Sequence, residues 1–355
     1  MSDLTELRRR IDEVDSKLIE LLNERADLVH EVGEVKRTNG LEIYAPARED
    51  ALLQALVKKS KGRLPANAIR AIYREIMSAS LSLEKDLTIA YFGQPASWTH
   101  QAARSKFGAS VKYSSFPNIS DVFDAVARGS ADYGVVPIEN SIEGAVNHTL
   151  DVFVDSDLLI CAQVLLRIEN HLLSKAPLEE ITRVYSHPQA LAQCRGWLRT
   201  NLPKADLIEV ASTSAAAERA AREEGAAAVA GQMAAEMNNL PILARAIQDS
   251  ALNTTRFLVI GQKTCPPTGD DRTSIMFSVQ DKAGALYNAL TPFKEFHISL
   301  NRIQSRPSKR KNWEYFFFVD LHGHCDDAAV KNALTELEKH CNFVKILGSY
   351  PDSKS

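Results

Sequence analysis

Two cationic side chains share one face of a long helix predicted near the start of the 355-residue chain. Apolar residues recur at alternating steps of three and four from Leu4 to Val35, as in an amphipathic helix with a coiled-coil seam. Arg25 occupies a seam position, and Lys36 returns to within about 20° of the same direction around the helix. A lone charge in a seam more often sets a coiled-coil register or reaches out to solvent. Two cations on one stripe predict a site for an anionic ligand.

Loops of small polar residues occur in the middle of the chain. They are Asn140-Ser141, His187-Pro188-Gln189, Ser212-Thr213-Ser214 and Asn253-Thr254-Thr255. Any one of them is accounted for as a turn or a helix cap. The free N–H groups at the start of a helix also bind anions, so capping is compatible with carboxylate binding. In an open α/β sheet, loops at strand ends line the ligand crevice, and we expect these loops to do so.

The residues that carry the two cations belong to an all-helical unit over residues 1–86. Its first helix is followed by predicted helices at Ala47–Lys59 and Ala66–Glu84. At 1.5 Å per residue the first helix is about 50 Å long, roughly twice the span of a compact unit of this size. We therefore expect it to pack against a second copy of the chain.

The polar loops belong to a region with a different sequence pattern, in which short strand-like runs alternate with helical stretches over residues 87–262. This alternation predicts a two-lobed α/β domain. Residues 263–271 contain Pro266-Pro267 and Gly269 and are predicted to be a linker. Residues 272–351 follow the order β-α-β-β-α-β of a ferredoxin-like domain. That order alone fits a structural or dimerisation domain equally well.

Composition limits the classes of partner. The net charge of −3 gives no broad positive field for nucleic acid or a membrane surface. The sequence has no run of about 18 apolar residues and no apolar signal-peptide core, so we expect a cytoplasmic protein. The five cysteines lack a Cys-x-x-Cys pair, which favours reduced thiols, and no metal is predicted. They are Cys161, Cys194, Cys265, Cys325 and Cys341.

The helical unit resembles the all-helical chorismate mutases. The matching residues are Leu7-Arg8, Ile11-Asp12, Asp15, Leu21-Leu22, Glu24-Arg25, Val32-Gly33, Lys36 and Arg48-Glu49. The resemblance implies that two subunits exchange their first helices and that each site takes one arginine, Arg8, from the neighbour. The reaction is pericyclic, so catalysis consists of holding one substrate conformer and stabilising charge on the breaking ether oxygen.

The resemblance also implies the site residues of the helical unit. They are Arg8, Arg25, Lys36, Arg48, Glu49, Ser80 and Glu84. The two arginines Arg8 and Arg25 would clamp the substrate carboxylates, Lys36 would donate to the ether oxygen, and Ser80 would orient a carboxylate. Arg48 and Glu49 would contact the ring hydroxyl.

Two positions of the helical unit depart from the family pattern. Ala45 replaces an acidic residue that some members carry, which removes one polar contact. Glu84 stands where a glutamine often donates to the ether oxygen, and a carboxyl group can donate there only when protonated.

Five motifs, in order, resemble prephenate dehydratases. They are Gly-x-x-x-Ser-x-Thr-His-Gln-Ala-Ala at 93–103, Val-Pro-Ile-Glu-Asn-Ser at 136–141, Tyr-Ser-His-Pro-Gln at 185–189, Ser-Thr-Ser-Ala-Ala at 212–216 and Thr-Arg-Phe at 255–257. The resemblance implies a periplasmic-binding-protein-like α/β fold. It also implies a reaction that loses carbon dioxide and water to form an aromatic ring, and no cofactor. Thr255 would donate or orient the proton at the departing ring hydroxyl.

The same resemblance implies the residues of the crevice. They are Asn140, Ser141, Thr213, Ser214, Arg256 and Phe257. Arg256 would help to bind a carboxylate, and Phe257 would pack against the ring as it becomes aromatic. Ala96 stands in the first motif where a second glycine is usual.

The last domain resembles the ACT domains attached to prephenate dehydratases. The resemblance rests on Gly284-Ala285-Leu286 and on Gln304-Ser305-Arg306-Pro307, where Gln304 replaces the usual glutamate. These two motifs would bind phenylalanine between two such domains of different chains. The free N–H groups of the first motif suit the carboxylate of an amino acid, whereas Arg306 would instead stabilise the loop or the interface.

Together the resemblances imply a bifunctional enzyme that converts chorismate to prephenate and prephenate to phenylpyruvate, inhibited by L-phenylalanine. It would be a homodimer or a higher homo-oligomer that binds neither nucleic acid nor membrane. Two alternatives remain: a dehydratase with a helical dimerisation arm, and a non-catalytic amino-acid sensor. The number of converging charges in the helical unit argues against a mere arm. No helix-turn-helix pattern with a basic face supports a sensor that binds DNA.

Overall fold

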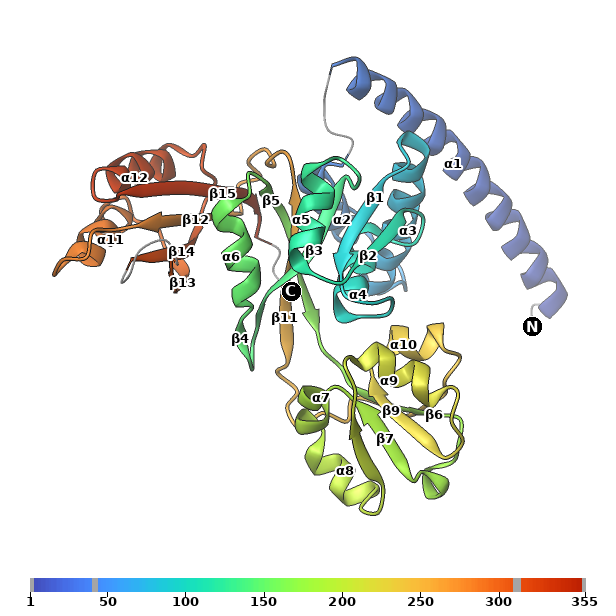
Figure 1. Ribbon diagram of the computed structural model, residues 1–355. Coiled ribbons are helices and arrows are strands. Elements are labelled where there is room, and N and C mark those ends of the chain that lie inside the picture. The colour runs from blue at the N-terminus through green and yellow to red at the C-terminus, as the bar shows by residue number, and fades with distance from the viewer. Residues whose placement is uncertain (1–2, 40–43, 309–313, 353–355) are drawn as a thin grey trace. The chain divides into compact units, whose positions relative to one another are not determined.

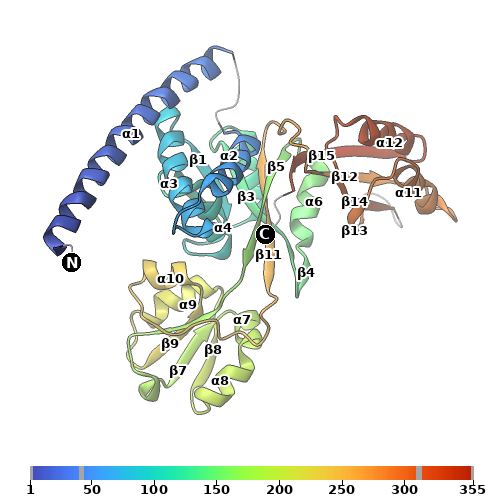
Figure 2. The ribbon, with the colours of Figure 1, turned by 180° about the vertical axis from the view of Figure 1, so that it is seen from behind.

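The protein is described by a computed structural model over residues 3–39, 44–308 and 314–352. These residues form two compact units, shown from opposite sides in Figures 1 and 2. A helical unit holds the chain up to Leu87 together with Phe107–Lys112, and an α/β unit holds Thr88–Lys106 and the chain from Tyr113 onward. Within the described ranges, no helix has both the length and the apolar character needed to cross a bilayer.

The helical unit consists of three helices, as predicted. They are α1 (Leu4–Thr38), α2 (Pro46–Lys59) and α3 (Ala66–Glu84). The Asp3 side chain caps α1 by accepting a hydrogen bond from Thr5 N, and Pro46 starts α2. Gly33 is the one buried residue of α1, so nearly all of the apolar stripe of this helix is exposed. The helix runs as a straight arm beside α3 (Figure 1).

The large lobe of the α/β unit is built on a sheet with strand order β2-β1-β3-β11-β5, with β4 beside β3. The strands are β1 (Thr88–Phe92), β2 (Lys112–Phe116), β3 (Tyr133–Asn140), β4 (Gly144–Ala145), β5 (Leu159–Arg167) and β11 (Thr254–Gly261). The helices are α4 (Trp98–Phe107), α5 (Ile119–Ala127) and α6 (Asn147–Asp155). β11 lies between β3 and β5 and is antiparallel to both, although it is the last strand of this sheet along the chain.

The small lobe is a second sheet, with order β10-β6-β9-β7-β8. Its strands are β6 (His171–Ser174), β7 (Arg183–Ser186), β8 (Asp206–Glu209), β9 (Ala226–Ala230) and β10 (Ile242–Ala244). Its helices are α7 (Pro188–Gln193), α8 (Arg195–Asn201), α9 (Thr213–Ala220) and α10 (Gln232–Met237). All five residues of β9 are buried, because helices cover both faces of the sheet. The chain crosses between the lobes twice, after β5 and before β11 (Figure 1). The predicted two-lobed α/β domain is thereby confirmed.

The last domain has the predicted β-α-β-β-α-β order and an antiparallel sheet β13-β14-β12-β15. Its elements are β12 (Asp271–Ser278), α11 (Ala285–Glu295), β13 (Leu300–Pro307), β14 (Tyr315–His322), α12 (Ala328–Glu338) and β15 (Phe343–Pro351). The two helices pack on one face, where Phe277, Phe293 and Leu337 are fully buried. The predicted ferredoxin-like fold is confirmed.

The ferredoxin-like domain and the large lobe share one hydrophobic core. Met276, Phe318 and Leu347 of the former belong to the same buried cluster as Leu150 and Ile160 of the latter. At Gly348 on β15 a Cβ atom would lie 2.2 Å from the carbonyl oxygen of Ile160, so only glycine permits this approach. The predicted linker is packed as well, since Thr264 Oγ1 donates to Ser349 O at 3.1 Å and Cys265 is buried.

Candidate functional site

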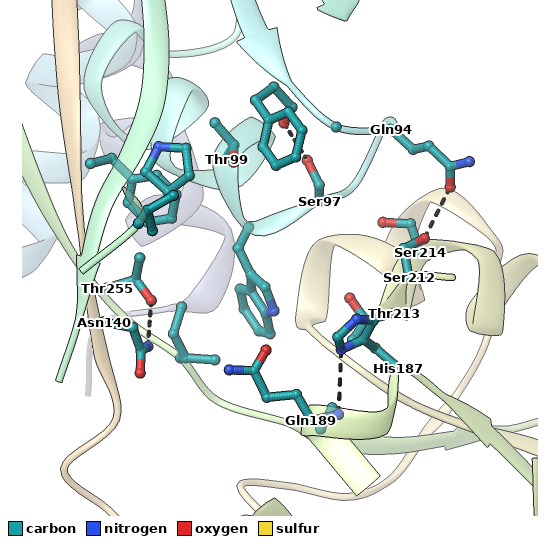
Figure 3. A pocket seen from close by; sticks show the side chains of 18 of the residues that line it. Gln94, Ser97, Thr99, Asn140, His187, Gln189, Ser212, Thr213, Ser214 and Thr255 are labelled. Carbon is teal, nitrogen blue, oxygen red and sulfur yellow. Dashed lines mark hydrogen bonds between the residues drawn. The ribbon is translucent and has the colours of Figure 1, made fainter. Parts of the chain in front are cut away.

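A crevice of 720 Å³ lies between the two lobes of the α/β unit. The large lobe contributes the 93–97 loop with the first residues of α4, the end of β3 and the start of β11. The small lobe contributes the starts of α7 and α9 (Figure 3). Phe92, Trp98 and Phe257 supply apolar surface. None of the described residues that line the crevice is an arginine or a lysine. An anionic ligand is therefore bound here without an arginine or lysine among these residues, so hydrogen-bond donors such as hydroxyl, amide and backbone N–H groups matter most.

Thr255 lies at the start of β11 with its hydroxyl in the crevice (Figure 3). Its Oγ1 accepts a hydrogen bond from Asn140 Nδ2 at 2.8 Å. Asn140 is held in this orientation because its Oδ1 accepts from the backbone N–H groups of Ile142 and Glu143, at 2.9 and 3.1 Å. Thr255 thus has an acceptor site already filled and a hydroxyl proton with no acceptor among the described residues. That proton is available to a ligand in the crevice.

On the small-lobe side, the start of α9 points backbone N–H groups at the crevice. Ser212 caps the helix by accepting from Ala215 N at 3.0 Å, and its hydroxyl donates to Gln94 Oε1 of the other lobe at 3.0 Å (Figure 3). The Oγ of Ser214 is buried and has no partner among the described residues. Thr213 and Ser214 line the crevice as expected of their positions.

Ser141 and Arg256 do not line the crevice, contrary to the role expected of them. Ser141 Oγ donates to Leu252 O at 2.6 Å and accepts from Thr254 N at 3.0 Å, so it fastens the β3 end to the chain entering β11. Arg256 points to the opposite face of β11 from Thr255 and Phe257, because side chains alternate along a strand. The geometry therefore does not support a carboxylate contact from Arg256.

The guanidinium of Arg256 is instead buried against the ferredoxin-like domain. It donates to Gln163 Oε1 at 2.9 Å, to Asp320 Oδ2 at 2.5 Å and to the Tyr350 hydroxyl at 2.7 Å. Burial opposes the charge on Asp320, but the nearby Arg256 cation outweighs it and holds the pKa of that carboxyl below its usual range. Ser274 Oγ donates to Asp320 Oδ1 at 2.5 Å and completes this buried network.

The 93–97 loop is held by His100, in the first turn of α4. Ala96 adopts a φ of 62°, in the left-handed region, and its N–H donates to His100 Nδ1 at 3.1 Å. The imidazole stacks on Tyr91, with ring centroids 4.5 Å apart. Burial, with a smaller contribution from Arg104, lowers the pKa of His100 to about 4, which keeps the ring neutral and able to accept this bond.

In the helical unit, two expected cations meet side chains of α3. Arg25 Nη1 donates to Ser80 Oγ at 2.5 Å, and Lys36 Nζ lies 3.5 Å from Glu84 Oε2. Gly33 of α1 lets the Glu84 side chain of α3 lie close to the helix, since a Cβ atom at position 33 would lie 3.1 Å from Glu84 Cγ. The sequence-predicted residues Arg25, Lys36, Ser80 and Glu84 are thus brought together within one chain.

Arg8 lies apart from that group. It is exposed on α1, 17 residues before Arg25, which places it about 25 Å away along the helix. Arg48 and Glu49 lie in the first turn of α2, where Arg48 is exposed and Glu49 is half-buried.

Comparison with known proteins assigns each part of the chain. Family models for chorismate mutase type II, prephenate dehydratase and the ACT domain match residues 7–85, 89–265 and 273–339. A bifunctional chorismate mutase/prephenate dehydratase of Aquifex aeolicus is 50% identical over 99% of this chain and 98% of its own length. This chain belongs to the bifunctional chorismate mutase/prephenate dehydratase family.

Two solved structures resemble the part of this family member that follows the mutase helices. One is a prephenate dehydratase from Arthrobacter aurescens in complex with L-Phe, with a TM-score of 0.70 and 32% identity. It covers 75% of this chain and 90% of that one. The other is GqqA, described as a novel type of quorum quenching acylase, with a TM-score of 0.70, 29% identity and coverage of 75% and 98%.

In the ACT domain, Gly284 has a φ of 79° and directly precedes α11. Ala285 is buried at the first turn of α11, and Leu286 follows it half-buried. At the end of β13, Ser305 and Pro307 are exposed, whereas Arg306 makes a bidentate contact with Asp151 of α6, with three N–O distances of 2.9 to 3.1 Å. The Arg306 side chain therefore joins the ACT domain to the dehydratase domain of the same chain.

Two amide side chains that line the dehydratase crevice were not predicted from the sequence: Asn170 and Gln193. Asn253 also lines the crevice, within the polar loop that was expected there. Nothing about Gln193 within α7 distinguished it from a surface residue. Asn170 lies in the first crossing between the lobes, which the sequence did not mark.

Proposed function

We propose that this chain rearranges chorismate to prephenate and converts prephenate to phenylpyruvate, and that L-phenylalanine inhibits it. The family membership supports both activities. The observation that carries the second is the Thr255 hydroxyl, which lines the crevice and whose oxygen accepts a hydrogen bond from Asn140. A sensor without catalysis would not need a donor fixed in this way.

In the dehydratase reaction, Thr255 donates its proton to the ring hydroxyl as that group departs, while the ring carboxylate leaves as carbon dioxide. The remaining carboxylate is bound by neutral donors, which include Ser214 Oγ and the N–H groups at the start of α9. The walls formed by Phe257 and Trp98 exclude water and pack on the ring as it becomes aromatic. The proposed reaction therefore needs no covalent intermediate between the protein and the substrate.

In the mutase reaction, Arg25 binds one carboxylate of chorismate, and Lys36 donates to the ether oxygen. Ser80 already orients Arg25 in the free protein. Arg8 completes the clamp from a second copy of the chain, because it lies about 25 Å from Arg25 on its own helix. Glu84 and the Arg48-Glu49 pair act at the ether oxygen and the ring hydroxyl.

The second copy also covers the apolar stripe of α1. Leu4, Leu7, Ile11, Val14 and Leu18 are each at least 41% exposed within one chain, which is a large apolar surface for a helix to leave in water. A homodimer with exchanged first helices buries this stripe. We place the working enzyme in the cytoplasm, as a dimer or a higher homo-oligomer.

The regulatory site is formed by Gly284-Ala285-Leu286 and Ser305-Arg306-Pro307, with L-phenylalanine held between the ACT domains of two chains. The solved relative in complex with L-Phe supports this effector. We assign residues 1–86 to the mutase, 87–262 to the dehydratase and 272–351 to regulation.

A discontinuous assay that reports chorismate, prephenate and phenylpyruvate separately tests the proposal. The wild-type chain is expected to form both products, with phenylpyruvate reduced by L-phenylalanine. Thr255→Val keeps the side-chain shape and removes the hydroxyl. It is expected to lower phenylpyruvate formation at least about a hundredfold while prephenate accumulates.

Thr255→Ser restores a hydroxyl and is the matched control, expected to recover most of the activity. Near-normal phenylpyruvate formation by Thr255→Val would show that the proton comes from another group. A wild-type chain that forms no phenylpyruvate from prephenate would refute the dehydratase function itself.

A further inference from the structure

A row of amide side chains runs from Thr255 across the gap between the lobes. Asn140 Nδ2, which donates to Thr255, also donates to Asn253 Oδ1 at 2.8 Å. Asn253 Nδ2 in turn donates to Gln193 Oε1 at 2.9 Å, and Asn170 Nδ2 lies 3.5 Å from the same oxygen. The row joins the end of β3, the second crossing segment and the last residue of α7.

The direction of every bond in this row is fixed from one end. Backbone N–H groups can only donate, so Ile142 N and Glu143 N require the oxygen of Asn140 to face them and its NH₂ group to face Asn253. The oxygen of Asn253 is then the acceptor, and its NH₂ group must face Gln193. Gln193 is left with its oxygen turned toward the row and its Nε2 group turned away.

The free end of the row meets the crevice. Gln193 is half-buried and lines the crevice, and its Nε2 has no partner among the described residues. Two other lining residues, Asn170 and Ser214, are nearly fully buried. Each has one polar atom, Asn170 Oδ1 or Ser214 Oγ, that finds no partner in the described part of the chain. Buried polar atoms without partners are costly, which indicates that a polar ligand completes this part of the crevice.

We propose that Gln193 binds a carboxylate of the dehydratase substrate through Nε2, and that Asn253 is a positioning residue that fixes which end of Gln193 faces the substrate. The inference rests on the proposed dehydratase function. Prephenate is a dianion, and the described lining residues include no arginine or lysine, so a fixed neutral donor contributes directly to its affinity. If the Gln193 amide were reversed, its oxygen would repel the same carboxylate.

Gln193→Leu tests the substrate contact, because it removes the donor and keeps the approximate size. We expect the KM for prephenate to rise about tenfold or more, as for the loss of one hydrogen bond to a charged group, with kcat changed by less than about threefold. Gln193→Glu should raise KM further, since it places a negative charge against the substrate. Chorismate mutase activity of the same preparations should stay unchanged, which shows that the chain is folded and at the stated concentration.

Gln232→Leu is the control, because Gln232 is an exposed glutamine of the same lobe that bonds to Glu236 on its own helix. Its KM should equal that of the wild type. A KM for Gln193→Leu within twofold of the wild type would overturn the assignment of Gln193, while the Thr255→Val result would still decide the dehydratase function independently. If Gln193→Leu is unstable, Gln193→Met carries the same expectation.

Asn253→Asp tests the positioning role. The new carboxylate still accepts from Asn140 but cannot donate to Gln193, so Gln193 turns its NH₂ group toward it and presents its oxygen to the substrate. KM should rise in this variant. The new charge also repels the substrate directly, so the same substitution is made in the Gln193→Leu background.

Asn253→Asp raises KM by one factor in the wild-type background and by another in the Gln193→Leu background, and the difference between the two measures what Asn253 does through Gln193. We expect the factor in the Gln193→Leu background to be at least threefold smaller than in the wild-type background. An equal factor in both backgrounds would show that Asn253 acts by its charge alone and would overturn its positioning role.

Discussion

His100 shows how one side chain sets the shape of a substrate loop. The family motif usually has glycine where this chain has Ala96, and the backbone there is left-handed, at a cost of about 1 to 2 kcal/mol for a residue with a Cβ atom. The Ala96 methyl group is buried in the small-lobe core, and its N–H is bonded to His100. Burial of the methyl group and the hydrogen bond offset the backbone cost, so the loop keeps its form without the glycine.

The depressed pKa of His100 makes the stability of the α/β unit depend on pH. The unfolded chain takes up a proton on this imidazole as the pH falls below about 6.5, whereas the folded chain does so only near pH 4. Folding stability is therefore lost as the pH falls between these values. Thermal unfolding at pH 7 and pH 5 should show a larger drop in Tm for the wild type than for His100→Asn, which accepts the same bond but does not titrate. Equal drops would show that His100 is not the group responsible.

Residue types were predictable only where a motif marked them. The Thr255 signature could be read from three letters, and Asn140 from a motif of six. The direction of Arg256 could not, because it depends on partners on β14 and β15 more than 60 positions away in the chain. Gln193 has the same difficulty, since its role comes from a hydrogen bond to a residue 60 positions later.

At the scale of elements, β11 is a two-sided strand. One face presents Thr255 and Phe257 to the crevice, and the other holds Arg256 against the ACT sheet. Helices and strands with strong periodicity were predictable, such as α1, α3 and the ACT strands. The short strands β2, β4, β6, β8 and β10 were not, because two to five residues at a sheet edge or bend carry too little periodicity.

The Arg256–Asp320 pair should be expensive to break. Both side chains are at most 8% exposed, so Asp320→Ala leaves a buried cation without its counter-charge. We expect a loss of about 3 to 5 kcal/mol, seen as a lower urea midpoint of the α/β unit. Replacing both partners by apolar residues, as in Arg256→Met with Asp320→Leu, should cost much less. The exposed pair Asp124–Arg128 is the control, and Asp124→Ala there should change little. Equal effects at the two pairs would contradict the burial argument.

At the scale of the whole molecule, the division into three parts was predictable from changes in the pattern of predicted helices and strands along the sequence. The core shared by the large lobe and the ACT domain was not, since it joins strands such as β5 and β15 that lie almost 200 residues apart. Apolar residues in both segments indicated burial, but not which surfaces bury one another.

Subunit sharing gives a prediction at the same scale. Arg8→Ala and Arg25→Ala are each expected to lose nearly all mutase activity. When the two proteins are mixed and allowed to exchange subunits, half of the dimers are mixed, and each of those has one intact site and one doubly altered site. Mutase activity should therefore recover to about a quarter of the wild-type value per chain. Exchange is followed independently, with a tag on one variant. Exchange without recovery would mean that Arg8 serves the site of its own chain.

The place of β11 in its sheet also bears on synthesis at the ribosome. The small lobe is continuous in sequence, from His171 to Ala244, and can fold as soon as it has emerged. The sheet of the large lobe cannot, because β11, the strand between β3 and β5, comes about 90 residues after β5, a delay of roughly 5 to 20 s at typical elongation rates. During that interval β3 and β5 each have an edge without its partner, which exposes the nascent chain to mispairing. The strand that carries Thr255 is thus the one that closes the gap, so a nascent chain acquires a complete crevice only when its large lobe is sealed.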